Sequence, residues 1–402
     1  MIYMDNIATT KPDERVIEAL VRFLKDDYGN PSSHFYPLGR SAFESVLKAR
    51  EQVALLINAK SDEVIFTSCG TESNNIAIRG LVDKLRKEGK THIILSEIEH
   101  YSVQNCIIKL LNQGFTFTKL KVDNNGLIDL DELKERINEK TGLVTIMHAN
   151  PEIGTIQCIS KIGEICKEKN VIFHVDAVAS CGHVPIDVNE FGCDLLSIAA
   201  QNFYGPKGAA ALYIRSGMTL TPLFDGGFQE KGIRPGTENV PAIVGMGTAA
   251  AIAKDEMADY TTKMKLLGDK LIEGLKSKIK YLHFTGDLNQ RLPGHVSFWV
   301  EHIEGESILL WLSLKDVCAA SGSACSSNIM GEDERDLKAS HVLSAIGVPS
   351  DICAGSITMS LSKYNSEEEV DYVIKIFPEL VKKLAEMSPF YEREGGENER
   401  TI

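Results

Sequence analysis

One cysteine stands in surroundings that favour a reactive thiol. Cys325 lies in the segment SGSACSS (321–327), among small polar residues that predict an exposed loop. An accessible cysteine that ionises to the thiolate is a nucleophile. A single cysteine is equally compatible with an inert, small apolar residue. The residue types alone leave both roles open.

A second candidate is an amide side chain at the end of a strand. The stretch DLLSIAAQNFYGPKGAAALYIR (194–215) has two short apolar runs on either side of the turn 205–208, which predicts two strands rather than helices. Asn202 lies where the first strand meets the turn. Ligands bind at strand ends in open α/β sheets, so we expect Asn202 to face a cleft.

Two further segments have the residue types of an anion site and of a buried acceptor. Gly70 and Thr71 follow an apolar run and open a helix, where free N–H groups and the helix dipole attract anions. A simple N-cap by Thr71 is the alternative. Asp176 ends a buried strand, and a buried carboxylate needs a partner such as a protonated pyridine nitrogen. The alternative for Asp176 is a capping or ion-paired role.

Strand and helix patterns alternate through the first half of the chain and would position these residues. The alternation predicts βαβ units and a mostly parallel sheet wrapped by helices. The expected strands are 63–68, 92–96, 143–148, 171–175, 195–200 and 209–214. The expected helices are 39–58, 72–85, 101–111, 130–139 and 161–169.

The pattern changes after Pro241. Long helices are expected to about Lys280, followed by a smaller unit with strands 295–300 and 357–361 and a closing helix over 367–387. We therefore expect a large cofactor-type α/β domain over 1–255 and a smaller α+β domain over 256–392 that carries Cys325. The polar residues 393–402 are expected to be disordered.

Composition excludes several classes of partner. With 402 residues the chain is long enough for two domains. The net charge of −13 argues against nucleic acid or an anionic membrane surface, and no apolar run reaches the length of a membrane span. Nine cysteines without Cys-x-x-Cys pairs predict neither a zinc site nor a disulfide framework. We expect no metal and a cytoplasmic location.

The stretch 194–215 resembles the cofactor segment of the cysteine desulfurases, pyridoxal-phosphate enzymes of the class V aminotransferase family. The segment 321–327 resembles their sulfur-accepting loop, in which the cysteine attacks substrate sulfur and carries a persulfide. The likeness extends from Tyr3 to the helix at Glu367. It implies the pyridoxal-phosphate transferase fold type I, with a mostly parallel seven-stranded sheet in the large domain. It also implies a homodimer that passes sulfur to an iron-sulfur scaffold or another acceptor protein.

The resemblance assigns expected roles residue by residue. Gly70 and Thr71 match the turn that holds the cofactor phosphate, and His100 matches the histidine that stacks on the ring. Asp176 matches the partner of the ring nitrogen. Thr237 matches a threonine that reaches the phosphate across a dimer interface. Cys325 matches the sulfur carrier, which favours the reactive thiol over the inert residue.

The departures from the family pattern gather around the cofactor. Asn202 stands at the position of the Schiff-base lysine, and Gln201 replaces the adjoining phosphate-side histidine. An amide cannot form an imine, and Lys207 is no substitute because the family has a lysine there as well. Four more replacements touch the cofactor ring or the substrate; they are Ala199 for Ser, Ala179 for Gln, Pro151 for Asn, and Thr358 for the Arg that grips the substrate carboxylate.

Three functions follow from this mixture of retained and lost residues. We favour a cysteine-desulfurase-like protein with a degenerate active site that handles sulfur through Cys325 without lysine-dependent turnover. The alternatives are an active desulfurase that converts L-cysteine to L-alanine and an enzyme persulfide with non-covalent pyridoxal phosphate, and a non-catalytic dimeric scaffold for iron-sulfur assembly. Pyridoxal phosphate is expected to be bound non-covalently or not at all, and a small amino acid is a candidate ligand.

The thiol at Cys325 has acidic neighbours in the sequence. Residues 331–336 form an acidic segment, which should oppose ionisation of the thiol if it lies close. Alkylation of the native protein is expected to label Cys325 before Cys69, Cys158 or Cys193, because those three lie on or beside elements predicted to be buried.

Overall fold

The computed structural model describes residues 1–321, 340–349 and 356–387. Cys325, the acidic segment 331–336 and the tail 393–402 lie outside the described residues.

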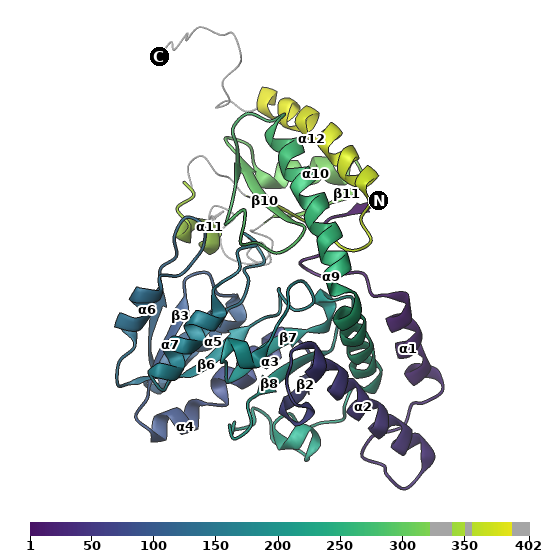
Figure 1. The fold of residues 1–402 in the computed structure, drawn as a ribbon, viewed down its shortest axis with the longest axis vertical. Coiled ribbons are helices and arrows are strands. Elements are labelled where there is room, and N and C mark those ends of the chain that lie inside the picture. The colour runs from purple at the N-terminus through teal and green to yellow at the C-terminus, as the bar shows by residue number, and fades with distance from the viewer. Residues whose placement is uncertain (322–339, 350–355, 388–402) are drawn as a thin grey trace.

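A seven-stranded mixed sheet forms the centre of the larger part of the molecule (Figure 1). Its strands, in spatial order, are β2 (Val64–Thr67), β8 (Ala210–Ile214), β7 (Leu195–Ala199), β6 (Ile172–Asp176), β5 (Thr141–Met147), β3 (His92–Ser96) and β4 (Thr116–Leu120). The strands are parallel except β8, which pairs antiparallel with both of its neighbours. This architecture confirms the expected α/β class with a mostly parallel sheet.

The strands are short apolar runs because helices cover both faces of the sheet. Val64 and Phe66 of β2 belong to one hydrophobic cluster, whereas Ile65 between them belongs to a cluster on the opposite face. Helices pack over these two faces; they are α1 (Glu14–Lys25), α2 (Pro37–Leu56), α3 (Gly70–Arg79), α4 (Val82–Lys87), α5 (Tyr101–Leu110), α6 (Leu130–Arg136), α7 (Ile159–Glu168) and α8 (Val188–Phe191). Parallel strands thus end together at one edge of the sheet.

A single long helix, α9 (Val240–Lys276), runs from the large sheet toward the smaller part of the fold (Figure 1). The boundary expected between 255 and 256 lies inside this continuous helix. In the described ranges, no helix has the length together with the hydropathy that a membrane span needs.

The smaller part has its own hydrophobic cluster around a four-stranded sheet. Its strands are β12 (Ala320–Ser321), β13 (Ile357–Ser360), β10 (His295–Val300) and β9 (Leu282–Phe284), accompanied by α10 (Gly305–Ser313), α11 (His341–Ala345) and α12 (Glu367–Met387). The N-terminal strand β1 (Ile2–Tyr3) pairs with β11 (Val317–Cys318). The backbone of Asp5 forms an isolated parallel β-bridge with that of Ser360. The N-terminal segment is therefore built into the smaller part before it reaches the large sheet.

Candidate functional site

Asn202 is a buried amide fixed by hydrogen bonds at the end of β7. It closes the 3-10 helix η3 (Ala200–Asn202) and is 3% exposed. Its Nδ2 donates to the carbonyl of Ile7 at 2.9 Å, and its buried Oδ1 has no hydrogen-bond partner among the described residues. The imidazole Nε2 of His183 lies 2.9 Å from the backbone oxygen of Asn202. Burial lowers the pKa of His183 to about 4, so this ring is neutral at neutral pH.

The backbone just after Asn202 is held in an unfavourable conformation. Tyr204 has a φ of 63°, in the left-handed region that large residues avoid. Its N–H donates to Oγ1 of Thr10 at 2.8 Å, and its hydroxyl accepts from the N–H of Lys363 at 3.0 Å. These contacts from distant segments fix the turn that carries Asn202.

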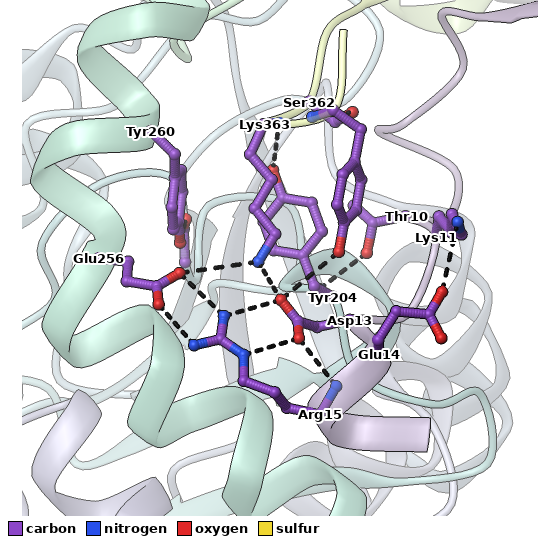
Figure 2. Close-up of polar contacts among 12 residues, drawn as sticks. Thr10, Lys11, Asp13, Glu14, Arg15, Tyr204, Glu256, Tyr260, Ser362 and Lys363 are labelled. Atoms are coloured by element: carbon purple, nitrogen blue, oxygen red, sulfur yellow. Dashed lines mark hydrogen bonds and ion pairs between the residues drawn. The ribbon is translucent and has the colours of Figure 1, made fainter. Parts of the chain in front are cut away.

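An ion-pair cluster, buried at Asp13 and Lys363 and exposed at Arg15 and Glu256, supports the same turn (Figure 2). Lys363 Nζ donates to Asp13 Oδ2 at 2.5 Å and lies 4.5 Å from the centre of the Tyr204 ring. Arg15 bridges Asp13 and Glu256, with its Nε 2.9 Å from Asp13 Oδ1 and its Nη1 2.6 Å from Glu256 Oε1. The hydrogen bonds from Arg15, and secondarily that from Lys363, lower the pKa of Asp13 below its usual range. We call Asp13, Arg15, Tyr204, Glu256 and Lys363 the Lys363 cluster.

A hydrogen-bonded chain joins two of the expected cofactor-binding residues. Asp176 ends β6 and is 6% exposed; its Oδ2 accepts from Asn74 Nδ2 at 2.7 Å, and its Oδ1 accepts from Val178 N at 3.0 Å. Asn74 Nδ2 also lies 2.9 Å from Ser102 Oγ, which in turn is 2.7 Å from His100 Nδ1. All the hydrogen bonds to Asp176 from described residues thus come from neutral groups, which leaves its charge available to a cationic partner.

The start of α3 is the expected anion site. The N-cap residue is Cys69, and it makes no side-chain capping hydrogen bond, so the capping role considered for Thr71 is wrong. A Cβ on Gly70 would lie 2.6 Å from Val178 Cγ2, so glycine allows α3 to approach the loop after Asp176. The N–H groups in the first turn of α3 and the carboxylate of Asp176 are thereby brought close together.

A cavity of about 370 Å³ lies between these elements. The expected cofactor-binding residues that line it are Gly70, Thr71, His100, Asp176, Gln201 and Asn202. Ala179 and Pro151 line it too, so two of the replacements noted in the sequence also lie at this cavity. Lys207 is exposed, donates to Thr9 Oγ1 at 3.4 Å and does not line it.

Thr237 lies apart from the cavity of its own chain. It is exposed and lines a different hollow, together with Glu230 and Arg234. The resemblance implies that Thr237 reaches the phosphate site of a partner subunit, and that role stays a prediction.

The cysteines correct one expectation. Cys193 is buried, as expected, and Cys158 is half-buried. Cys69 is exposed and lines the 370 Å³ cavity, so the expectation that it lies protected is wrong. The reason is its place at the N-cap, one residue before α3, rather than in the preceding strand.

A second cavity of about 200 Å³ adjoins the first. Three acidic residues line it, Asp5, Glu99 and Glu152, and none of them stands in a sequence pattern that predicts a functional role. Thr358 also lines it, is 3% exposed, and donates from its Oγ1 to the backbone oxygen of Glu152 at 3.1 Å. Position 358, where the resemblance implied a lost arginine, is thus at a cavity next to the expected cofactor site.

Fold and cleft together define the class of protein. Residues 2–373 match the family described as aminotransferase class-V, and the chain belongs to that family. Among its curated relatives is the cysteine desulfurase IscS of Methanosarcina thermophila, 46% identical over 98% of this chain and 95% of the relative. The cysteine desulfurase IscS of Dictyoglomus turgidum is 45% identical over 97% and 96% of the two chains.

Solved structures show the same fold. A NifS-like protein superposes with a TM-score of 0.87 at 37% identity and covers 95% of this chain and 100% of its own. The apo cysteine desulfurase of Thermococcus onnurineus superposes with a TM-score of 0.85 at 25% identity, over 95% of each chain. The expected fold type I architecture is confirmed.

Proposed function

We propose that the chain mobilises sulfur as a cysteine desulfurase that holds pyridoxal phosphate without a covalent bond to the protein. The similarity of 41–46% identity to proteins named cysteine desulfurase supports this function, because it extends over nearly the whole chain. The observation that carries the non-covalent binding is the buried amide of Asn202, which lies at the cleft where a covalent link would need an amine.

The residues at the cleft fit a non-covalent cofactor. The backbone N–H groups of Gly70 and Thr71 would hold its phosphate, Asp176 would accept from its ring nitrogen, and His100 would lie against its ring. When bound, pyridoxal phosphate supplies an electron sink for the reacting amino acid. Asn202 offers a hydrogen bond but no amine.

The missing lysine leaves proton transfer at the substrate carbon without its usual base. A positioned base contributes roughly 10²–10⁴-fold, so slow turnover is expected of this chain. Cys325, outside the described residues, would take the sulfur and pass it to an acceptor protein such as an iron-sulfur scaffold. A reducing compartment such as the cytoplasm suits a protein whose seven described cysteines are free thiols.

A second candidate function is sulfur relay without turnover of L-cysteine. It is favoured by the lining of the two cavities, which contains no Lys or Arg among the described residues to grip a substrate carboxylate. The release of alanine distinguishes desulfurase turnover from sulfur relay. Incubation with pyridoxal phosphate and L-cysteine should yield alanine if the desulfurase proposal holds, whereas persulfide accepted from a donor without any alanine supports the relay.

Replacing Cys325 with Ser should abolish persulfide labelling, since the hydroxyl cannot carry sulfur in this form. Labelled persulfide measured by mass spectrometry should fall to background, with the fold unchanged by circular dichroism. Cys69→Ser is the matched control, because Cys69 is the exposed thiol at the cleft and should not be required. If the Cys325→Ser protein is labelled at the wild-type level, both the desulfurase and the sulfur-relay proposals are wrong. The non-catalytic scaffold is then the remaining function.

We also propose that the chain forms a homodimer. Large aromatic side chains are exposed on the described surface, with Phe35 98% and Phe228 95% accessible, and aromatic residues are enriched at protein interfaces. Thr237 is exposed as well, as a residue that serves a partner's site would be. Light scattering at micromolar concentration should give twice the 44.3 kDa of the chain, and a monomer would contradict the proposal.

A further inference from the structure

A polar groove of about 500 Å³ lies along α3 and α5 and adjoins the cofactor cleft. The two helices pack against each other, and Thr71, His100 and Ser102 line both the groove and the 370 Å³ cavity. These three residues lie at or next to the starts of α3 and α5. The groove therefore meets the cleft beside the turn that is expected to hold the cofactor phosphate.

The side chains of this groove carry positive charge and no negative charge. Arg79 lies in the last turn of α3 and Lys109 in the last turn of α5, and both are exposed. Among the described residues, no Asp or Glu lines the groove, and neither cation has an ion-pair or hydrogen-bond partner. In a chain with a net charge of −13, the groove is a place that attracts anions.

Helical spacing brings the two cations to the same groove. Thr71, Asn75 and Arg79 recur every four residues of α3, which places them on one face of the helix. Burial raises the pKa of the Cys106 thiol to about 11, whereas the positive charges of Arg79 and Lys109 act in the opposite direction. Both cations are thus within electrostatic range of one sulfur atom, and Cys106 itself lines the groove.

The cations lie at a distance from the phosphate turn. Arg79 follows Thr71 by eight residues of helix, a rise of about 12 Å. The two side chains are therefore placed to act on an anion at the outer end of the groove, before it reaches the first turn of α3. Charges at such a distance act mainly on the approach of an anionic ligand, and salt screens their effect.

The second cavity offers an approaching anion no such attraction. Asp5, Glu99 and Glu152 line it, and no Lys or Arg is among its described lining residues. Gly70 and Thr71 are also absent from the described lining of this cavity. Of the two spaces that adjoin the cleft, the groove along α3 and α5 is the one that combines positive charge with access to the phosphate turn.

We propose that Arg79 and Lys109 attract the phosphate group of pyridoxal phosphate and guide the cofactor along this groove into the cleft. The inference rests on the proposed function, because a cofactor without a covalent bond to the chain has to associate from solution. Arg79 and Lys109 are positioning residues that raise the rate at which the cofactor arrives. The bound cofactor would be held by the residues of the cleft, so its dissociation rate should not depend on these two cations.

Stopped-flow mixing of the full chain with pyridoxal phosphate tests the proposal, with the absorbance of the bound cofactor as the signal. The double variant Arg79→Gln/Lys109→Gln should associate about fivefold more slowly at an ionic strength of about 0.01 M. The difference should disappear near about 1 M, where the Debye length is about 3 Å. The dissociation rate should equal that of the wild type. Arg79→Lys/Lys109→Arg keeps both charges and should restore the wild-type association rate.

The matched control is Lys161→Gln/Lys254→Gln, which removes the same two charges from exposed positions of α7 and α9 that line neither the groove nor the cleft. Its association rate should fall by less than about twofold. An equal fall in both double variants would overturn the proposal, because net charge rather than the groove would then set the rate.

Two further outcomes separate this inference from the proposed function. If Arg79→Gln/Lys109→Gln associates at the wild-type rate, or only its dissociation is faster, the guiding role is wrong while non-covalent binding of the cofactor stands. If the wild-type chain binds no pyridoxal phosphate at any concentration, both the guiding role and the proposed cofactor binding are wrong.

Discussion

Replacing Asn202 with Lys is expected to attach pyridoxal phosphate covalently to the chain. The substitution puts a primary amine at a 3% exposed position of the 370 Å³ cavity, which Asp176 also lines. Borohydride reduction and peptide mapping should then find one pyridoxyl group at position 202. The wild-type chain should carry none, because Asn202 has no amine and Lys207 is directed to Thr9.

Asn202→Gln is the matched control for this experiment, because it lengthens the side chain and keeps the amide. It should give no adduct. A pyridoxyl group on Lys207 of the wild-type protein would show that another lysine reaches the cofactor. A folded Asn202→Lys protein that forms no adduct at saturating pyridoxal phosphate would show that the cleft does not hold this cofactor.

Replacing Lys363 with Met should destabilise the fold by about 3 kcal/mol. Lys363 and Asp13 form an ion pair whose side chains are 11% and 9% exposed, and removing one partner of a buried pair typically costs 3–5 kcal/mol. We expect the lower end of that range because Arg15 still donates to Asp13. Urea unfolding measures the loss, and Lys265→Met, which breaks an exposed pair with Asp269, should cost under about 0.5 kcal/mol.

This loss should depend on pH. The pKa of Asp13 is lowered in the folded state, first by Arg15 and then by Lys363, so the stability contributed by its ionised form is fully present above its unfolded pKa of about 4. It is lost as the pH falls further, toward the folded pKa. Arg15 keeps the folded pKa of Asp13 low in Lys363→Met as well, so this contribution falls in parallel in the two proteins just below pH 4. The difference between wild type and Lys363→Met should therefore stay constant from pH 7 to pH 4 and narrow only as the pH approaches the folded pKa of Asp13. A difference that already shrinks between pH 7 and pH 4 would show that a group other than Asp13 carries the effect.

The strands of the sheet centre were predictable because each is a short apolar run covered on both faces. The strand expected over 92–96 is β3, and the run expected over 195–200 is β7 with one residue of η3. The edge strand β4, with the sequence TFTKL, was missed because it is partly exposed and mixes polar with apolar residues. The helix expected over 72–85 is two helices, because α3 ends at Gly80, where a Cβ would lie 2.5 Å from the backbone oxygen of Ile76.

Only the part of the cleft that the large sheet contributes could be predicted from the sequence. Asp176, His100 and Asn202 all lie at strand ends or just beyond them, and a parallel sheet brings such positions to one edge. The second cavity, which Asp5, Glu99 and Glu152 line, depends on the smaller part of the fold. That part places Thr358 and Ser340 within hydrogen-bond distance of Glu152. No local pattern shows that one oxygen of Glu99 will have no donor among the described residues, since that depends on which groups surround it in three dimensions.

The attachment of the N-terminal segment dictates an order of events during synthesis. Ile2 and Tyr3 pair with Val317 and Cys318, and Asp5 bridges to Ser360, yet Ile7 is the residue that holds Asn202. Residues 2–7 therefore leave the ribosome long before their strand partners exist. Contacts so distant in sequence form late, so the large sheet can assemble while the cleft still lacks one wall. Ligand binding at the cleft thus reports completion of the whole chain, and a nascent chain stalled before residue 317 would have a folded sheet but no finished site.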